Sequence, residues 1–117
     1  MPEPKRILVV DDEPGIRQAT AMLLSFDGHQ VQTAGSGEEA LQKYEPGFFD
    51  LVVTDYSMPG MKGDELALAL KKQTPAVPIL LLTAFPPHLQ PAGIDMVMTK
   101  PFDLASLREG LVKLFAL

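Results

Sequence analysis

The stretch FDLVVTDYSMPG, residues 49–60, decides the fold of this chain. Leu51, Val52 and Val53 form a continuous apolar run rich in β-branched side chains, which predicts a strand buried on both faces. The run leads to Asp55, and the Met-Pro-Gly sequence that follows predicts a turn. Asp55 is therefore expected at the carboxyl end of a central strand, the edge at which open α/β sheets place their chemistry.

Composition limits the classes of protein that are possible. A chain of 117 residues predicts one domain, and 46% hydrophobic with 21% charged residues is typical of a globular protein. The net charge of −5 disfavours binding to nucleic acid or to anionic membranes, and the absence of cysteine excludes disulfides and thiolate metal sites. The apolar run at residues 79–85 is too short to span a bilayer, and residues 1–4 lack an apolar signal region, so we expect a cytoplasmic protein.

Strand and helix patterns alternate along the whole chain. Besides the Asp55 strand, apolar runs predict strands at residues 5–10, 29–34, 78–82 and 94–99. Apolar residues at helical spacing predict helices that begin near Pro14, Ser36, Gly63 and Asp103. This alternation predicts an α/β fold with a five-stranded parallel sheet, covered on both faces and doubly wound in the order 2-1-3-4-5.

Polar residues gather where these strands end. In the predicted order, Asp11, Asp12 and Asp55 converge at one edge of the sheet, joined by Thr83 and Lys100. Three neighbouring carboxylates repel one another, and a hard cation with oxygen ligands would offset that repulsion. Mg²⁺ suits a site with few carboxylates, because it retains water and often bridges to phosphate.

This set of side chains is sufficient for phosphorylation of an aspartate. An Asp neutralised by a metal ion can attack a phosphoryl group, whose oxygens then need further charge and hydrogen bonds. Thr83 offers a hydroxyl group and Lys100 a point charge on a long stem.

The whole chain resembles the receiver domain of two-component response regulators, a family with a flavodoxin-like fold. The resemblance rests on four segments in this order, ILVVDDE at residues 7–13, DYSMPGMKG at 55–63, Thr83-Ala84 and Lys100-Pro101-Phe102. It implies that Asp55 is the phosphoacceptor, that Asp12 binds Mg²⁺ directly, that Asp11 holds metal-bound water and that Ser57 gives a backbone carbonyl to the metal.

The resemblance also implies roles at the ends of the last two strands. Thr83 matches the switch hydroxyl, Lys100 the lysine that contacts the phosphoryl group, and Lys100–Pro101 a peptide bond that is usually cis. Val97 departs from the family, which usually carries Tyr or Phe there as a second switch residue. The interval from Thr83 to Lys100 is shorter than usual by roughly a turn and a half of helix, so the helix between them is expected to be shortened or irregular.

The expected protein is a single receiver domain over residues 1–117, with no output domain. It would accept a phosphoryl group from a histidine kinase or a histidine phosphotransfer protein and then change its binding to an unknown downstream protein. It would assist its own phosphorylation and dephosphorylation without being a turnover enzyme. Phe85 and Ser57 match positions that tune dephosphorylation in the family.

Other interpretations stay open. A phosphatase of the haloacid dehalogenase type needs a second Asp two residues after the nucleophile, where this chain has Ser57. A pseudo-receiver that binds partners without phosphorylation is the main alternative. Individually, the acids could be helix-start or turn residues, and Thr83 and Lys100 ordinary surface groups. His29 and His88 are expected in solvent-exposed loops, and the methionines are expected to be packing residues.

Overall fold

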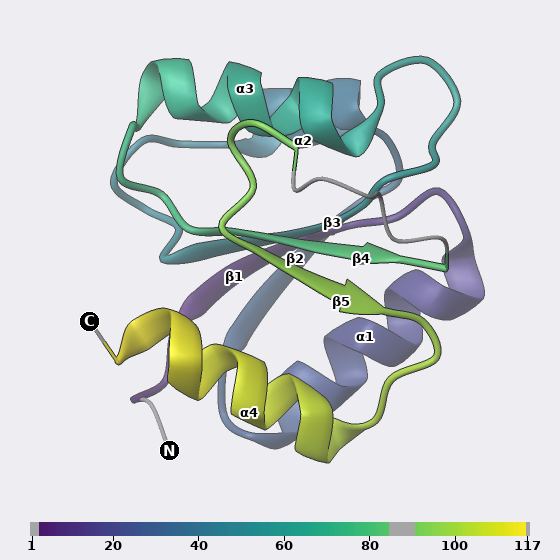
Figure 1. Ribbon diagram of the computed structural model, residues 1–117, viewed down its shortest axis with the longest axis vertical. Coiled ribbons are helices and arrows are strands. Elements are labelled where there is room, and N and C mark those ends of the chain that lie inside the picture. Colours follow the sequence, from purple (N-terminus) through teal and green to yellow (C-terminus); the bar gives the residue numbers. More distant parts are fainter. Residues whose placement is uncertain (1–2, 85–90, 117) are drawn as a thin grey trace.

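The computed structural model describes residues 3–84 and 91–116 of the chain. Its centre is a parallel sheet with strands in the order β2-β1-β3-β4-β5, which confirms the predicted topology (Figure 1). The strands are β1 (Arg6–Val10), β2 (Gln30–Ala34), β3 (Leu51–Asp55), β4 (Ile79–Thr83) and β5 (Met96–Thr99).

Helices cover both faces of the sheet, as predicted. On one face lie α2 and α3, and on the other lie α1 and α4 (Figure 1). The helices within the described residues are α1 (Pro14–Phe26), α2 (Gly37–Lys43), α3 (Gly63–Gln73) and α4 (Leu104–Phe115).

Local sequence sets where the helices begin. Pro14 occupies the first position of α1, where its missing N–H costs nothing. At α2 the Ser36 hydroxyl accepts the Glu39 N–H at 3.0 Å, and at α4 an Asp103 carboxylate oxygen accepts the Ser106 N–H at 2.8 Å. The Glu39 carboxylate in turn accepts the N–H of Gly35, the residue before the N-cap Ser36.

Side chains alternate along each strand into two separate cores. Leu8 and Val10 of β1 face α2 and α3, whereas Ile7 and Val9 face α1 and α4. The central strands β3 and β4 are buried along their whole length. This double burial explains why their sequences are continuous apolar runs.

Several predicted details differ from the structure. The strands β1, β2 and β4 each begin one residue later than predicted, and β4 ends at Thr83. Strand β5 begins at Met96, because the Ile94 N–H bonds to the Pro91 carbonyl in a turn. The prediction for His29 was wrong: it is 6% exposed, and its Nδ1 accepts the N–H of Lys5 at 2.9 Å. Met22 is not a packing residue, since it is 71% exposed.

Other predictions fall outside the described residues. The shortened helix expected within residues 85–93 falls mostly there, as do Phe85 and His88. In the part of the chain that is described, no helix is both long and apolar enough to cross a bilayer.

Candidate functional site

The candidate site lies where β1 and β3 end side by side. Val10, the last residue of β1, pairs with Thr54, so Asp11 and Asp12 leave β1 beside Asp55. One carboxylate oxygen from each of the three aspartates lies within 4.8 Å of the others. Asp11 and Asp55 are buried and Asp12 is half-buried, so the cluster opens outward through Asp12.

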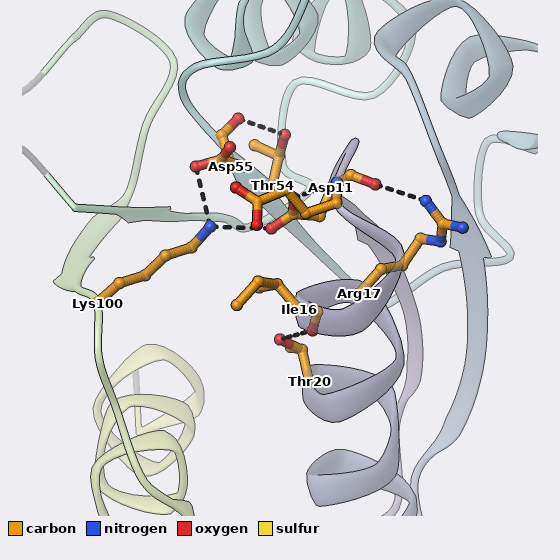
Figure 2. Close-up of polar contacts among 8 residues, drawn as sticks. Asp11, Ile16, Arg17, Thr20, Thr54, Asp55 and Lys100 are labelled. Atoms are coloured by element: carbon orange, nitrogen blue, oxygen red, sulfur yellow. Dashed lines mark hydrogen bonds and ion pairs between the residues drawn. The ribbon is translucent and has the colours of Figure 1, made fainter.

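Lys100 reaches this cluster from the end of β5 (Figure 2). Its Nζ lies 2.9 Å from an oxygen of Asp11 and 3.3 Å from an oxygen of Asp55. The side chains of Lys100, Asp11 and Asp55 are 15%, 4% and 8% exposed, so their contacts are largely shielded from water. One lysine therefore contacts two buried carboxylates, and the carboxylate of Asp12 lies close by.

The pKa values of Asp55 and Lys100 are shifted by burial and by the neighbouring charges. Burial raises the pKa of Asp55 and the neighbouring Asp11 charge adds to the rise, which the charge of Lys100 only partly offsets. Burial opposes the charge of Lys100, but its hydrogen bond to Asp11 and the two carboxylate charges raise its pKa overall. Lys100 is thus held as a cation, while the cluster keeps an excess of negative charge.

Hydrogen bonds fix the backbone around the cluster. An oxygen of Asp11 accepts the Glu13 N–H at 3.0 Å, and the Asp11 carbonyl accepts a guanidinium N–H of Arg17 at 2.9 Å (Figure 2). The buried Thr54 hydroxyl donates to the Asp55 carbonyl at 3.0 Å. Sequence reasoning missed Arg17 and Thr54, because no pattern distinguishes them from an exposed helix arginine and a strand threonine.

The turn after β3 needs glycine at position 63. A Cβ placed on Gly63 would lie 2.3 Å from the Asp55 carbonyl oxygen. The Gly63 N–H also donates to the Tyr56 carbonyl at 2.9 Å. The first turn of α3 therefore packs directly on the backbone that carries Asp55, which only glycine permits.

The structure places the other predicted site residues around this centre. Thr83 ends β4, is buried, and accepts the Lys100 N–H on its backbone carbonyl at 2.8 Å. Ser57 is exposed two residues after Asp55, and the Lys100–Pro101 peptide is cis. Val97 is half-buried and packs with the core beneath α2 and α3.

The donor atoms of the cluster define the kind of cation that it could hold. In the described part of the chain, this group of potential ligands consists of carboxylates alone. Carboxylate oxygens suit hard cations such as Mg²⁺, whereas soft metals prefer sulfur or imidazole. With one lysine against three carboxylates, the charge balance also favours a divalent cation.

The fold and site place this chain in the class of doubly wound α/β domains that carry acidic residues and a lysine at the carboxyl ends of their strands. Residues 7–112 match the family model of the response regulator receiver domain. The chain belongs to this family and is a two-component response regulator receiver domain.

Relatives differ in how much of their length the chain matches. Chemotaxis protein CheY-3 of Vibrio cholerae is 36% identical over 118 residues, which cover 94% of this chain and 91% of that protein. The transcriptional regulatory protein TcrA of Mycobacterium tuberculosis is 37% identical over 107 residues, 87% of this chain. The chain spans 42% of the length of TcrA, less than half of that regulator.

Solved structures agree with the fold. The response regulator TrrA of Thermotoga maritima, in complex with Mg²⁺-BeF, has a TM-score of 0.86 and 41% identity, covering 95% of this chain and 99% of that one. A second structure holds TrrA in complex with the histidine kinase ThkA, with a TM-score of 0.84 and 40% identity, covering 95% and 98% of the two chains.

Proposed function

We propose that Asp55 of this receiver domain accepts a phosphoryl group in an Mg²⁺-dependent reaction, from a histidine kinase or a histidine phosphotransfer protein. The observation that carries the proposal is the position of Asp55, at the end of β3 within 4.8 Å of two other carboxylates and 3.3 Å from the Lys100 ammonium. The complexes of the related TrrA with Mg²⁺-BeF and with a histidine kinase support it.

The reaction transfers a phosphoryl group from a histidine nitrogen of the donor to a carboxylate oxygen of Asp55. A carboxylate oxygen of Asp55 forms a bond to phosphorus, and the bond from phosphorus to the donor nitrogen breaks, with its electron pair going to the donor histidine. The attacking Asp55 must be ionised, and the Lys100 charge favours that form against the effect of burial. The ammonium then stands beside the new phosphoryl oxygens.

The remaining residues have separate parts in the proposal. Asp12 would bind Mg²⁺ directly, Asp11 would hold a metal-bound water, and Ser57 would offer its backbone carbonyl. Bound Mg²⁺ would neutralise the carboxylates and the phosphoryl oxygens. Thr83, at the end of the neighbouring strand β4, would donate its hydroxyl to the phosphoryl group.

The output of the domain would be a change in binding, not in turnover. Movement of Thr83 toward the phosphoryl group would alter the surface around β4 and β5, and with it the affinity for a downstream protein. Each chain would hold one phosphoryl group at Asp55, with Val97 in place of an aromatic second switch. We propose that residues 1–117 form this one receiver domain.

Intact-mass spectrometry after incubation with acetyl phosphate and Mg²⁺ tests the proposal. Wild type should gain the mass of one phosphoryl group, and both Asp55→Asn and the addition of a chelator should abolish the gain. Asp50→Asn is the matched control, because Asp50 carries the same charge but lies at the other end of β3, where it accepts the Arg6 N–H. Wild type that stays unmodified while folded would instead favour a phosphorylation-independent interaction module.

A further inference from the structure

Arg17 connects α1 to the acidic cluster, although it is neither a predicted metal ligand nor a predicted contact of the phosphoryl group. Its Nη1 donates to the carbonyl oxygen of Asp11 at 2.9 Å (Figure 2). The backbone pairing of β1 with both of its neighbours extends to Val10. Asp11 lies one residue further on, and its carbonyl oxygen accepts a hydrogen bond from the Arg17 side chain instead of from the backbone of a neighbouring strand.

This hydrogen bond fixes a peptide group that two aspartates share. The carbonyl of Asp11 and the N–H of Asp12 lie in one plane, because the peptide bond resists rotation. The Asp11 side of this plane is held elsewhere too, since its N–H donates to Ala34 at 3.1 Å and its carboxylate accepts from Glu13 and Lys100. Arg17 holds the carbonyl oxygen of this plane, and the rigid peptide bond carries that constraint to the N–H of Asp12.

The guanidinium of Arg17 is itself held in a fitted place. A Cβ on Gly35 would lie 3.2 Å from Nη1 and 3.9 Å from Cζ, so the guanidinium packs against the backbone between β2 and α2. The charge of Arg17 helps to lower the pKa of Glu39, after the larger effects of the hydrogen bonds from Lys43 and Gly35. Arg17 therefore joins three segments, the end of β1, the start of α1 and the turn before α2.

We infer that Arg17 is a positioning residue for Asp12. By fixing the Asp11–Asp12 peptide plane, it sets the direction in which the half-buried Asp12 carboxylate leaves the backbone toward Asp55. The inference rests on the proposed function, in which Asp12 binds Mg²⁺. Groups that orient metal ligands from outside typically change metal affinity by 10- to 100-fold when they are lost.

A simple charge effect predicts the opposite result. Arg17 is a cation hydrogen-bonded to the backbone of the acidic cluster, so removing its charge alone should strengthen the binding of Mg²⁺. If Arg17 acts by positioning Asp12, its loss should weaken binding in spite of the more negative site. The sign of the change therefore distinguishes the two effects.

The experiment is a titration with MgCl₂, followed by NMR of backbone amides, without a phosphodonor. Arg17→Gln should bind Mg²⁺ about tenfold more weakly than wild type. Arg108→Gln is the matched control: it also removes one positive charge and one anchor of α1, but its partner is Asp27, and it should leave Mg²⁺ affinity unchanged. Unchanged or tighter Mg²⁺ binding by folded Arg17→Gln overturns the inference.

A second variant covers the possibility that Arg17→Gln does not fold. Gly35→Ala keeps every charge and crowds the guanidinium, because the new methyl group would lie 3.2 Å from Nη1, so it should also weaken Mg²⁺ binding, by less. Wild-type affinity in Gly35→Ala would then overturn the inference. If wild type binds no Mg²⁺ and accepts no phosphoryl group, the proposed function is overturned as well. If wild type is phosphorylated and both variants bind Mg²⁺ as tightly as wild type, the inference alone is overturned.

Discussion

At two places in this molecule a basic side chain contacts a carboxylate that is largely shielded from water, but the balance of charge differs. One basic group faces one carboxylate at the first place and two carboxylates at the second. At the C-terminal end of α1, Arg108 of α4 gives two hydrogen bonds to Asp27, at 2.7 and 2.6 Å. These bonds lower the pKa of Asp27. At the edge of the sheet, Lys100 stands between Asp11 and Asp55, and the pKa of Asp55 is raised.

The difference separates an architectural ion pair from a reactive one. Asp27 has a partner of matching geometry, so its negative charge is favoured in the folded protein and joins α1 to α4. Asp55 is buried and shares its lysine with Asp11, so its charge is disfavoured unless a further cation arrives. A buried negative charge that the protein leaves without full compensation is typical of a site that binds a ligand.

The largest effect is expected where the backbone holds the reactive site. Gly63→Ala would place a methyl group 2.3 Å from the Asp55 carbonyl oxygen, so α3 must move away from β3. We expect a loss of about 3 kcal/mol in the free energy of unfolding, measured by urea denaturation. Gly15→Ala is the control: its Cβ would meet nothing within 4 Å, and it should add about 0.5 kcal/mol. Equal stability of the two variants would contradict this packing.

A pH-dependent effect is expected near the Asp27–Arg108 pair. Burial lowers the pKa of His29, with a smaller contribution from Lys5, against the opposing charge of Asp27. Neutral His29 therefore stabilises the fold fully above its unfolded pKa of about 6.5, and this contribution is lost as pH falls below that value. Unfolding free energy measured from pH 8 to 5 should fall in this window.

His29→Asn provides the control for this titration. An Asn side chain can accept the Lys5 N–H that Nδ1 of His29 now accepts at 2.9 Å, without taking up a proton. Its stability should vary less with pH between 6.5 and 5 than that of wild type. The same pH dependence in both proteins would assign the titration to other groups.

The smallest effect is expected for a buried group that is unpaired but uncharged. The Tyr44 hydroxyl has no hydrogen-bond partner among the residues that the structure describes, while its ring stacks on Phe49. Tyr44→Phe removes only that hydroxyl, so the free energy of unfolding should stay within about 1 kcal/mol of wild type or rise. A larger loss in the free energy of unfolding would show that the hydroxyl has a hydrogen-bond partner. Tyr44 could then no longer serve as the uncharged, unpaired group with which Asp55 is compared.

The sequence was sufficient to predict the fold and the gathering of the acids. Asp11 and Asp12 follow the buried strand β1, and Asp55 is the last residue of β3. Because neighbouring parallel strands end at a common edge, the order of strands alone brings the three together. Lys100 follows from the same rule at β5. The roles of these residues in phosphorylation stay predictions.

What the sequence could not reveal depends on contacts between distant segments. His29 follows a glycine at a helix end, a pattern typical of exposed loops, yet it is buried against the start of β1. The Asp27–Arg108 pair joins residues 81 positions apart, and no local pattern links them. Arg17 is close to Asp11 in sequence, but only the path of α1 aims its guanidinium at that carbonyl.

The most direct measurement is thermal denaturation of wild type, Asp55→Asn and Asp27→Asn, each with EDTA and with Mg²⁺. The raised pKa of Asp55 means that its ionised form costs stability at neutral pH, and this cost fades as pH falls through the folded pKa. Asp55→Asn should therefore raise Tm in EDTA, while Asp27→Asn should lower it, because the ionised form of Asp27 is the stabilising one. Mg²⁺ should raise the Tm of wild type and Asp27→Asn, with little effect on Asp55→Asn. A lower Tm for Asp55→Asn in EDTA, with no effect of Mg²⁺ on wild type, would contradict the claim that unbalanced charge marks the functional site.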